Sequence, residues 1–296
     1  MATLDAAAPS NPAPAPLRRF RALRALLRNP AGVIPLLFLG AVMAMAVLAP
    51  RFYPDDPLSM VARPFLWPGV NPAFPLGTDS LGRDVAAGLV WGARISLLVG
   101  FSAMLLGVSI GLVVGAVAGY FGGRTDLILV KVIEIFQTLP SFVLLVVLVA
   151  IAQPSIGTVT VAIGIVTWPI TARLVRAEFR SLREKDFVTA ARSLGFGHAR
   201  IIVREILPNA LPPIIVSSSV LVATAILMES ALSFLGLSDP NHVSWGSMIG
   251  AGRELLRTAW YLSAIPGIAI VLTVLALNLL GDALNDALNP RLSQER

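Results

Sequence analysis

Few side chains in this 296-residue chain are placed to do covalent chemistry. The segment GVSIG around Ser109 matches the G-x-S-x-G pattern of serine hydrolases. That nucleophile needs a strand-turn-helix context and a histidine base. The two histidines, His198 and His242, lie in polar segments away from it, and the chain has no cysteine to form a thiolate metal site. We therefore predict no catalytic residue and no metal site.

The sequence also argues against binding of nucleotides or nucleic acids. A P-loop requires G-x-x-x-x-G-K-[ST], because backbone amides and the lysine hold the phosphates. The chain contains two lysines, and neither lies in such a segment. Its net charge of +6 is not gathered with aromatic residues into a platform for nucleic acid. We expect no cofactor on this chain and no nucleic-acid partner.

The candidate binding residues are polar side chains inside apolar segments, where an ionisable group is costly and often functional. Glu229 is the strongest, beside Ser230. It either faces a translocation path or outer gate, or is a carboxylate at a helix end or subunit interface; the pattern leaves both open. Ser217 either lines a cavity or bonds to its own backbone. Asn278 lies near the inner end of the last apolar segment; it is a path candidate for which we favour an interhelical hydrogen bond over contact with a substrate.

A second polar group precedes the second apolar segment. The string PLGTDSLGRDVAAGLVWGARISLLVGF is typical of an interfacial helix capped by Thr78 or Asp79. We favour local charge pairing and capping for Asp79, Arg83 and Asp84 over contact with a substrate.

These residues must be positioned by membrane-spanning helices. Apolar residues make up 56% of the chain and charged residues 14%, and a helix of about 20 apolar residues crosses a bilayer. Five charge-free windows are long enough, and the third divides near Pro154 and Gly157. We predict an all-α polytopic fold of six transmembrane helices, the third starting near Leu127 with a kink at Pro140. In addition, Gly107, Gly111, Gly115 and Gly119 form a small-residue ridge for close helix packing, within the chain or against a partner.

Basic residues predict the orientation, because they are retained on the cytoplasmic side. With both termini in the cytoplasm, 17 of the 23 basic residues lie on cytoplasmic segments, and eight of them fall in one loop, 173–204. The predicted organisation has six parts. They are a disordered, basic tail at 1–28, a first span at 29–50, an external insertion with its interfacial helix at 51–92, a core of five spans at 93–284, a cytoplasmic loop at 176–207 within that core, and a tail at 285–296.

The large cytoplasmic loop is itself predicted to be helical. Residues 181–194 contain no Gly or Pro and repeat apolar residues at near-helical intervals. Gly195 follows where a left-handed residue ends a helix, and residues 198–207 form a second helix before Pro208. On pattern alone, this element either rests on the inner leaflet or presents a small-residue face to another protein's groove.

The loop resembles the EAA signature of ABC importer permeases. In that signature two alanines are followed four residues later by glycine and, after a short helix, by Leu-Pro; here these are Ala190, Ala191, Gly195, Leu207 and Pro208. The strings WPITARLVRAEFRSL, ALSFLG, VSWG and NLLGDALNDALNPR match as well, and PLGTDSLGRDVAAGLVWGARISLLVGF resembles the subfamily that imports dipeptides, oligopeptides and nickel. The resemblance covers the chain from about residue 17 onward.

This sequence departs from the signature in two places. Thr189 stands where the signature has glutamate, and Glu205 where isoleucine is usual. The resemblance therefore assigns ATPase coupling to the helix and its surface rather than to an acidic side chain at position 189. Its candidate coupling residues are Phe187, Thr189, Ala190, Ala191, Arg192, Gly195, Leu207 and Pro208.

The resemblance implies the type I importer fold, a MetI-like core with one extra N-terminal helix and a periplasmic insertion, in the bacterial inner membrane. It implies four kinds of partner: a second, homologous permease, two ABC ATPases that hold ATP and Mg, a periplasmic solute-binding protein, and the lipid bilayer. The expected function is ATP-driven import of peptides or a related solute such as a nickel chelate or glutathione. An ion-gradient-driven transporter is the alternative, which inverted repeats and a mid-membrane charge pair would favour.

Overall fold

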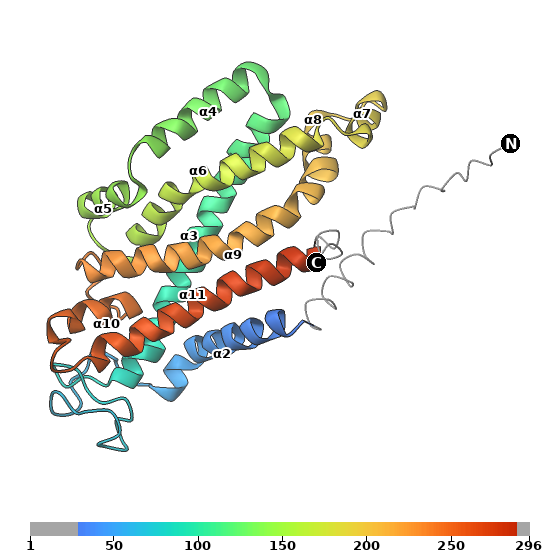
Figure 1. Ribbon diagram of the computed structural model, residues 1–296. Coiled ribbons are helices and arrows are strands. Elements are labelled where there is room, and N and C mark those ends of the chain that lie inside the picture. Colours follow the sequence, from blue (N-terminus) through green and yellow to red (C-terminus); the bar gives the residue numbers. More distant parts are fainter. Residues whose placement is uncertain (1–28, 289–296) are drawn as a thin grey trace.

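The computed structural model describes residues 29–288, and these residues form an almost entirely helical bundle (Figure 1). The predicted tail at 1–28 and residues 289–296 of the predicted C-terminal tail lie outside the described residues. The helices are α2 (Pro30–Phe52), α3 (Val85–Phe121), α4 (Gly123–Thr138), α5 (Ser141–Ala152), α6 (Ile156–Leu182), α7 (Asp186–Ser193), α8 (His198–Arg200), η1 (Ile201–Ile206, π-helical), α9 (Leu207–Phe234), α10 (Trp245–Gly252), η2 (Arg253–Leu255, 3₁₀) and α11 (Tyr261–Leu288).

Within residues 29–288, five helices are long and apolar enough to cross a membrane: α2, α3, α6, the continuous run from α8 to α9, and α11. An 81° bend separates α4 from α5. If these two helices count as one broken span, they add a sixth crossing. Pro140 stands at the bend, where a missing N–H and a ring clash end the helix. The predicted all-α polytopic fold is confirmed, with the third span broken where a kink was expected.

The glycine ridge of α3 packs inside the chain, along α6. A Cβ atom added at Gly111 would lie 2.5 Å from the Thr171 Cβ, and one added at Gly115 would lie 2.5 Å from the Ala172 carbonyl oxygen. The same face continues from Gly107 to Gly119. Because these positions carry no side chain, α3 and α6 approach closely over several turns, and this pair forms the most extensive helix contact in the bundle.

The structure differs from the prediction at the start of α3. The helix begins at Val85, and Asp84 is its N-cap, with the Asp84 Oδ1 accepting the Ala86 N–H at 2.8 Å. Thr78 and Asp79 lie in the preceding loop, where the buried Thr78 hydroxyl donates to the Arg63 carbonyl at 2.7 Å. There is thus no separate interfacial helix, because Gly82 (φ +78°) and the turn at Asp79 keep this segment non-helical.

The two ends of the bundle carry different structures (Figure 1). At one end, the start of α2 and the end of α11 lie on the same side as α7; we call this the α7 end. At the other, the non-helical segment 53–84 lies beside α10; we call this the α10 end. Residues 232–257, predicted to be interfacial or re-entrant, contain the last turn of α9, the short helix α10 and the η2 turn. Helix α11 runs to Leu288, so it takes in residues 285–288 of the predicted tail.

Candidate functional site

The connection between α6 and α9 forms a small helical element at the α7 end (Figure 1). Helix α6 continues to Leu182, the chain turns at residues 183–185, and α7 begins at Asp186. The predicted single helix over 181–194 is therefore wrong at its start, because Ser181 and Leu182 complete the last turn of α6. A long α6 places α7 beyond the apolar part of the bundle.

Gly195 ends α7 in a Schellman motif. Its φ is +77°, its N–H donates to the Arg192 carbonyl at 2.9 Å, and the Phe196 N–H donates to the Ala191 carbonyl at 3.1 Å. Both bonds satisfy carbonyl groups that the helix end would leave free, and glycine adopts this backbone conformation without strain. The left-handed conformation predicted at Gly195 is present, and it turns the chain back toward α8.

Helix α7 has one face turned toward the bundle. Val188 and Ala191 are buried in a cluster with Phe179, Ile201 and Ile206. The sequence predicted that Ala190 and Ala191 form one exposed surface. In the structure they do not, because adjacent residues on a helix point about 100° away from each other. Ala191 packs inside its own chain.

A neighbouring face of α7 is exposed and partly apolar. Phe187, Ala190 and Leu194 follow one another at spacings of three and four residues, and the exposed fractions of Phe187 and Leu194 are 40% and 72%. We call these three residues the α7 stripe. Thr189 and Arg192 are also exposed, farther round the helix. An exposed apolar stripe with a polar rim is suited to a groove on another protein.

Contacts that the sequence did not reveal hold this element against the end of α3. The Arg183 Nη1 donates to the carbonyl oxygens of Gly119 and Tyr120, at 3.2 and 3.3 Å, so it caps the last turn of α3. The Tyr120 hydroxyl and the His198 Nδ1 are hydrogen-bonded at 2.8 Å. The Arg176 guanidinium of α6 donates two hydrogen bonds to the Asp126 carboxylate of α4, one of them from Nη2 to Oδ2 at 2.6 Å.

The element then joins α9 without a break. Helix α8, the π-helical residues Ile201–Ile206 and α9 form one run. Leu207 is partly buried, and Pro208 is exposed where the π-helical residues pass into α9. Helices α6 and α9 therefore both connect to this element, α6 through a single turn and α9 without a break.

Glu229 lies buried between three elements at the α10 end. Its carboxylate accepts hydrogen bonds from the Ser233 hydroxyl at 2.7 Å and from the Ser96 hydroxyl of α3 at 3.2 Å. The Ser244 hydroxyl donates to Ser233 at 3.3 Å, and the Trp245 N–H of α10 donates to Ser96 at 3.3 Å. With an exposed fraction of 3%, Glu229 joins α3, α9 and α10.

The other path candidates lie in different surroundings. Ser230 is buried and its hydroxyl donates to the Ile226 carbonyl at 2.8 Å. Ser217 is partly buried, and Asn278 is exposed on the outer surface of α11. The structure therefore does not bring Glu229, Ser217 and Asn278 together at one site.

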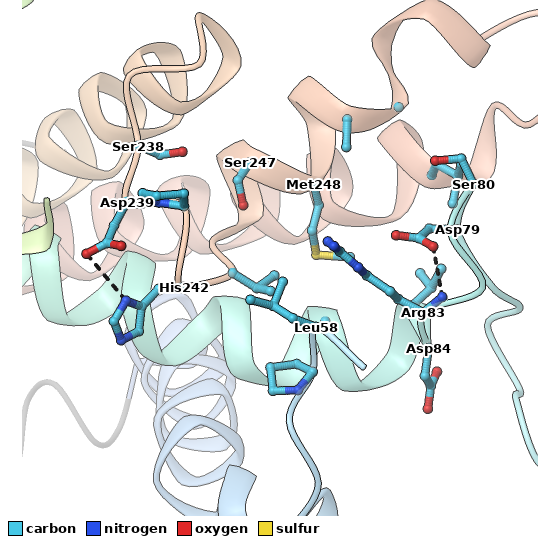
Figure 2. A pocket seen from close by; sticks show the side chains of 18 residues that line it. Leu58, Asp79, Ser80, Arg83, Asp84, Ser238, Asp239, His242, Ser247 and Met248 are labelled. Carbon is cyan, nitrogen blue, oxygen red and sulfur yellow. Dashed lines mark hydrogen bonds and ion pairs between the residues drawn. The ribbon is translucent and has the colours of Figure 1, made fainter. Parts of the chain in front are cut away.

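A cavity of about 170 Å³ opens at the α10 end (Figure 2). The segment 53–84, the first turn of α3, the α9–α10 connection, α10 and α11 contribute to its wall. Burial raises the pKa of the Asp84 carboxyl. Burial alone would also raise the pKa of Asp239, but hydrogen bonds from the Asn241 N–H, the His242 ring and the Ile156 N–H hold that pKa below its usual value.

Together these features define a polytopic membrane protein with an exposed helical element at one end. A family model described as "Binding-protein-dependent transport system inner membrane component" matches residues 111–294. The chain belongs to this family, and it is a multi-pass membrane component of a transport system.

Curated relatives resemble the chain over nearly its whole length. The chain is 37% identical to a dipeptide transport system permease protein, DppC, of Haemophilus influenzae, over 90% of this chain and 92% of the relative. It is also 37% identical to a di/tripeptide transport system permease protein, DppC, of Pseudomonas aeruginosa, over 99% and 98% of the two chains.

The fold is shared with solved transporter structures. An inward-facing structure of the MetNI methionine ABC transporter aligns with a TM-score of 0.58 at 20% identity, over 68% of this chain and 96% of the other. The chain therefore has the fold of an ABC importer permease, with additional residues beyond that core.

Proposed function

We propose that this chain is a permease subunit of an ATP-driven importer that moves dipeptides, oligopeptides or a related small solute across the bacterial inner membrane. The observation that carries the proposal is the 37% identity to peptide transport permeases over 90% or more of the chain. The related small solutes in this proposal include nickel chelates and glutathione. Transport by a subunit of this kind involves no bond-breaking on the chain itself.

The proposed orientation places the α7 end in the cytoplasm. Eight basic residues in 173–204 favour that side, since basic loops are retained there. Both termini then lie in the cytoplasm, and the segment 53–84 and α10 lie outside. The extracytoplasmic binding protein delivers the solute at the α10 end.

The proposed coupling runs through the α7 stripe. A second, homologous permease completes the pathway, and each of two ATPase subunits receives one stripe in a surface groove; those subunits hold ATP and Mg. When ATP binding closes the ATPase pair, the stripe moves with it. Because Arg183 and Tyr120 join the element to α3 while α6 and α9 continue from it, the movement biases the bundle between outward-open and inward-open states.

Uptake by sealed vesicles tests the function. Proteoliposomes contain this chain, its partner permease and the two ATPases, with the cognate binding protein and a radiolabelled dipeptide outside. We expect uptake that requires internal ATP and persists with a protonophore. An assembly whose ATPases lack the P-loop lysine is the control and should show no uptake. Gradient-driven uptake by this chain alone would contradict the proposal and support an ion-gradient-driven transporter instead.

A further inference from the structure

The cavity at the α10 end contains a cation whose side chain has no partner within the described chain. The Arg83 side chain extends into the cavity beside Met248 (Figure 2). Its Nε is buried without a hydrogen-bond partner, and among residues 29–288 its guanidinium forms no ion pair. A guanidinium stays charged and carries five donors, so a partly buried one is stabilised by an anion.

The carboxylates around Arg83 are engaged in holding the backbone. The Asp79 Oδ1 accepts the N–H groups of Leu81 and Arg83, both at 2.8 Å. The Asp84 Oδ1 caps α3, and Asp239 accepts the Asn241 N–H at 3.0 Å and faces the His242 ring at 3.4 Å. The acidic side chains at the cavity wall repel any anion, but they repel a multiply charged one such as phosphate more strongly than a single carboxylate. Of these two ligands, Arg83 therefore holds the carboxylate more easily.

The remaining wall suits an amino-acid side chain. Leu58, Val85, Val243, Met248 and Leu262 contribute apolar surface, and methionine adapts to ligands of different shape. The volume of about 170 Å³ is smaller than the roughly 300–1,000 Å³ of pockets that enclose whole drug-sized ligands. The cavity therefore fits one residue at the end of a chain.

We propose that this cavity binds the C-terminal residue of a short peptide on the extracytoplasmic side, with the terminal carboxylate on the Arg83 guanidinium. The proposal rests on the proposed function, because it assigns a peptide as the solute and the α10 end as the outer side. A guanidinium holds a carboxylate through two parallel hydrogen bonds. Such a site would capture a peptide after its release from the binding protein.

Peptide binding to the assembled transporter tests this site. The complex of both permeases and both ATPases is placed in lipid nanodiscs without binding protein or nucleotide. Binding of dialanine and of its C-terminal amide is compared by ligand-detected NMR. We expect dialanine to bind at least about tenfold more tightly than the amide, because only the free carboxylate forms a charge-assisted pair.

Two variants and a control separate the site from a general effect. In Arg83→Gln, dialanine binding should fall at least about tenfold, to the level of the amide. Leu58→Trp should also abolish binding by filling the cavity while leaving Arg83 in place, which preserves the test if Arg83→Gln fails to assemble. Arg63→Gln, which changes an exposed arginine in the same segment, should bind dialanine like the unchanged protein.

Three results would overturn the site. Two are seen in the binding experiment itself: equal binding of dialanine and its amide, or no binding of either. The third is an Arg83→Gln variant that binds dialanine normally but captures the binding protein less well in a separate pull-down. The last would assign the anion to an acidic side chain of that partner. ATP-driven dipeptide uptake is measured separately. Its absence would overturn the proposed function, whereas normal uptake without Arg83-dependent binding would overturn only the site.

Discussion

Glu229 shows at the scale of one residue why an intramembrane carboxylate need not line a pathway. Its two oxygen atoms accept hydrogen bonds from Ser233 and Ser96, and the Trp245 N–H continues the network into α10. Buried polar groups of this kind are stabilising only while their partners are in place. The geometry favours a role in holding α10 against α3 and α9.

We predict that Glu229→Ala destabilises the assembled transporter by about 1–3 kcal/mol, because it leaves serine hydroxyls buried without their acceptor. Glu229→Gln keeps an acceptor oxygen and should retain most of the stability. The thermal unfolding midpoint of the purified complex in detergent measures both. Glu134→Ala, which removes a carboxylate from an exposed ion pair with Lys131, is the control and should have little effect. If Glu229→Ala left the complex as stable as the control does, the structural role would be contradicted.

At the scale of elements, α7 has one buried face and one exposed face. Its inner face packs into a cluster with α3, α6, η1 and α9, and its outer face carries the α7 stripe. The Schellman motif at Gly195 and the Arg183 cap set the angle of the element. The exposed stripe can transmit a partner's movement to the bundle only if α7 is held rigidly.

We predict that Leu194→Glu lowers ATPase affinity about tenfold, or roughly 1.4 kcal/mol, while the permease still inserts and binds its partner permease. A carboxylate on the stripe replaces apolar contact with an unpaired charge. Co-purification of the ATPase with a tagged permease measures the effect. Thr189→Glu introduces the same side chain at an exposed position where the signature has glutamate, so it should retain the ATPase. Equal retention by both variants would remove the stripe from the docking surface.

At the scale of the whole molecule, the two ends of the bundle differ in structure and charge. The α7 end carries the basic loop, and the α10 end carries the segment 53–84 with the Arg83 cavity. Our proposals at both ends depend on one orientation of the bundle in the membrane.

That orientation is testable because the natural chain has no cysteine. Ser59 and Ser193 are exposed at opposite ends. We predict that Ser59→Cys reacts with a membrane-impermeant maleimide in intact spheroplasts. Ser193→Cys should react only after the membrane is opened. The unchanged chain is the unlabelled control, and the reverse labelling pattern would invert the assigned topology.

The sequence by itself determined the apolar spans, the break at Pro140, the left-handed turn at Gly195 and the family. These features depend on composition and on local conformational preference, which a few neighbouring residues set. It also identified the glycine ridge of α3, but it did not show which helix packs against that ridge.

Tertiary structure alone decided which surfaces those elements share. Ala190 and Ala191 are equivalent in a pattern, yet only packing against Ile201 and Phe179 buries the second. Ser96 and Glu229 are 133 residues apart in the sequence, and Tyr120 and His198 are 78 apart. The Arg83 cavity exists because 53–84, α10 and α11 meet. Long-range contacts of this kind arise from packing, and no spacing along the chain encodes them.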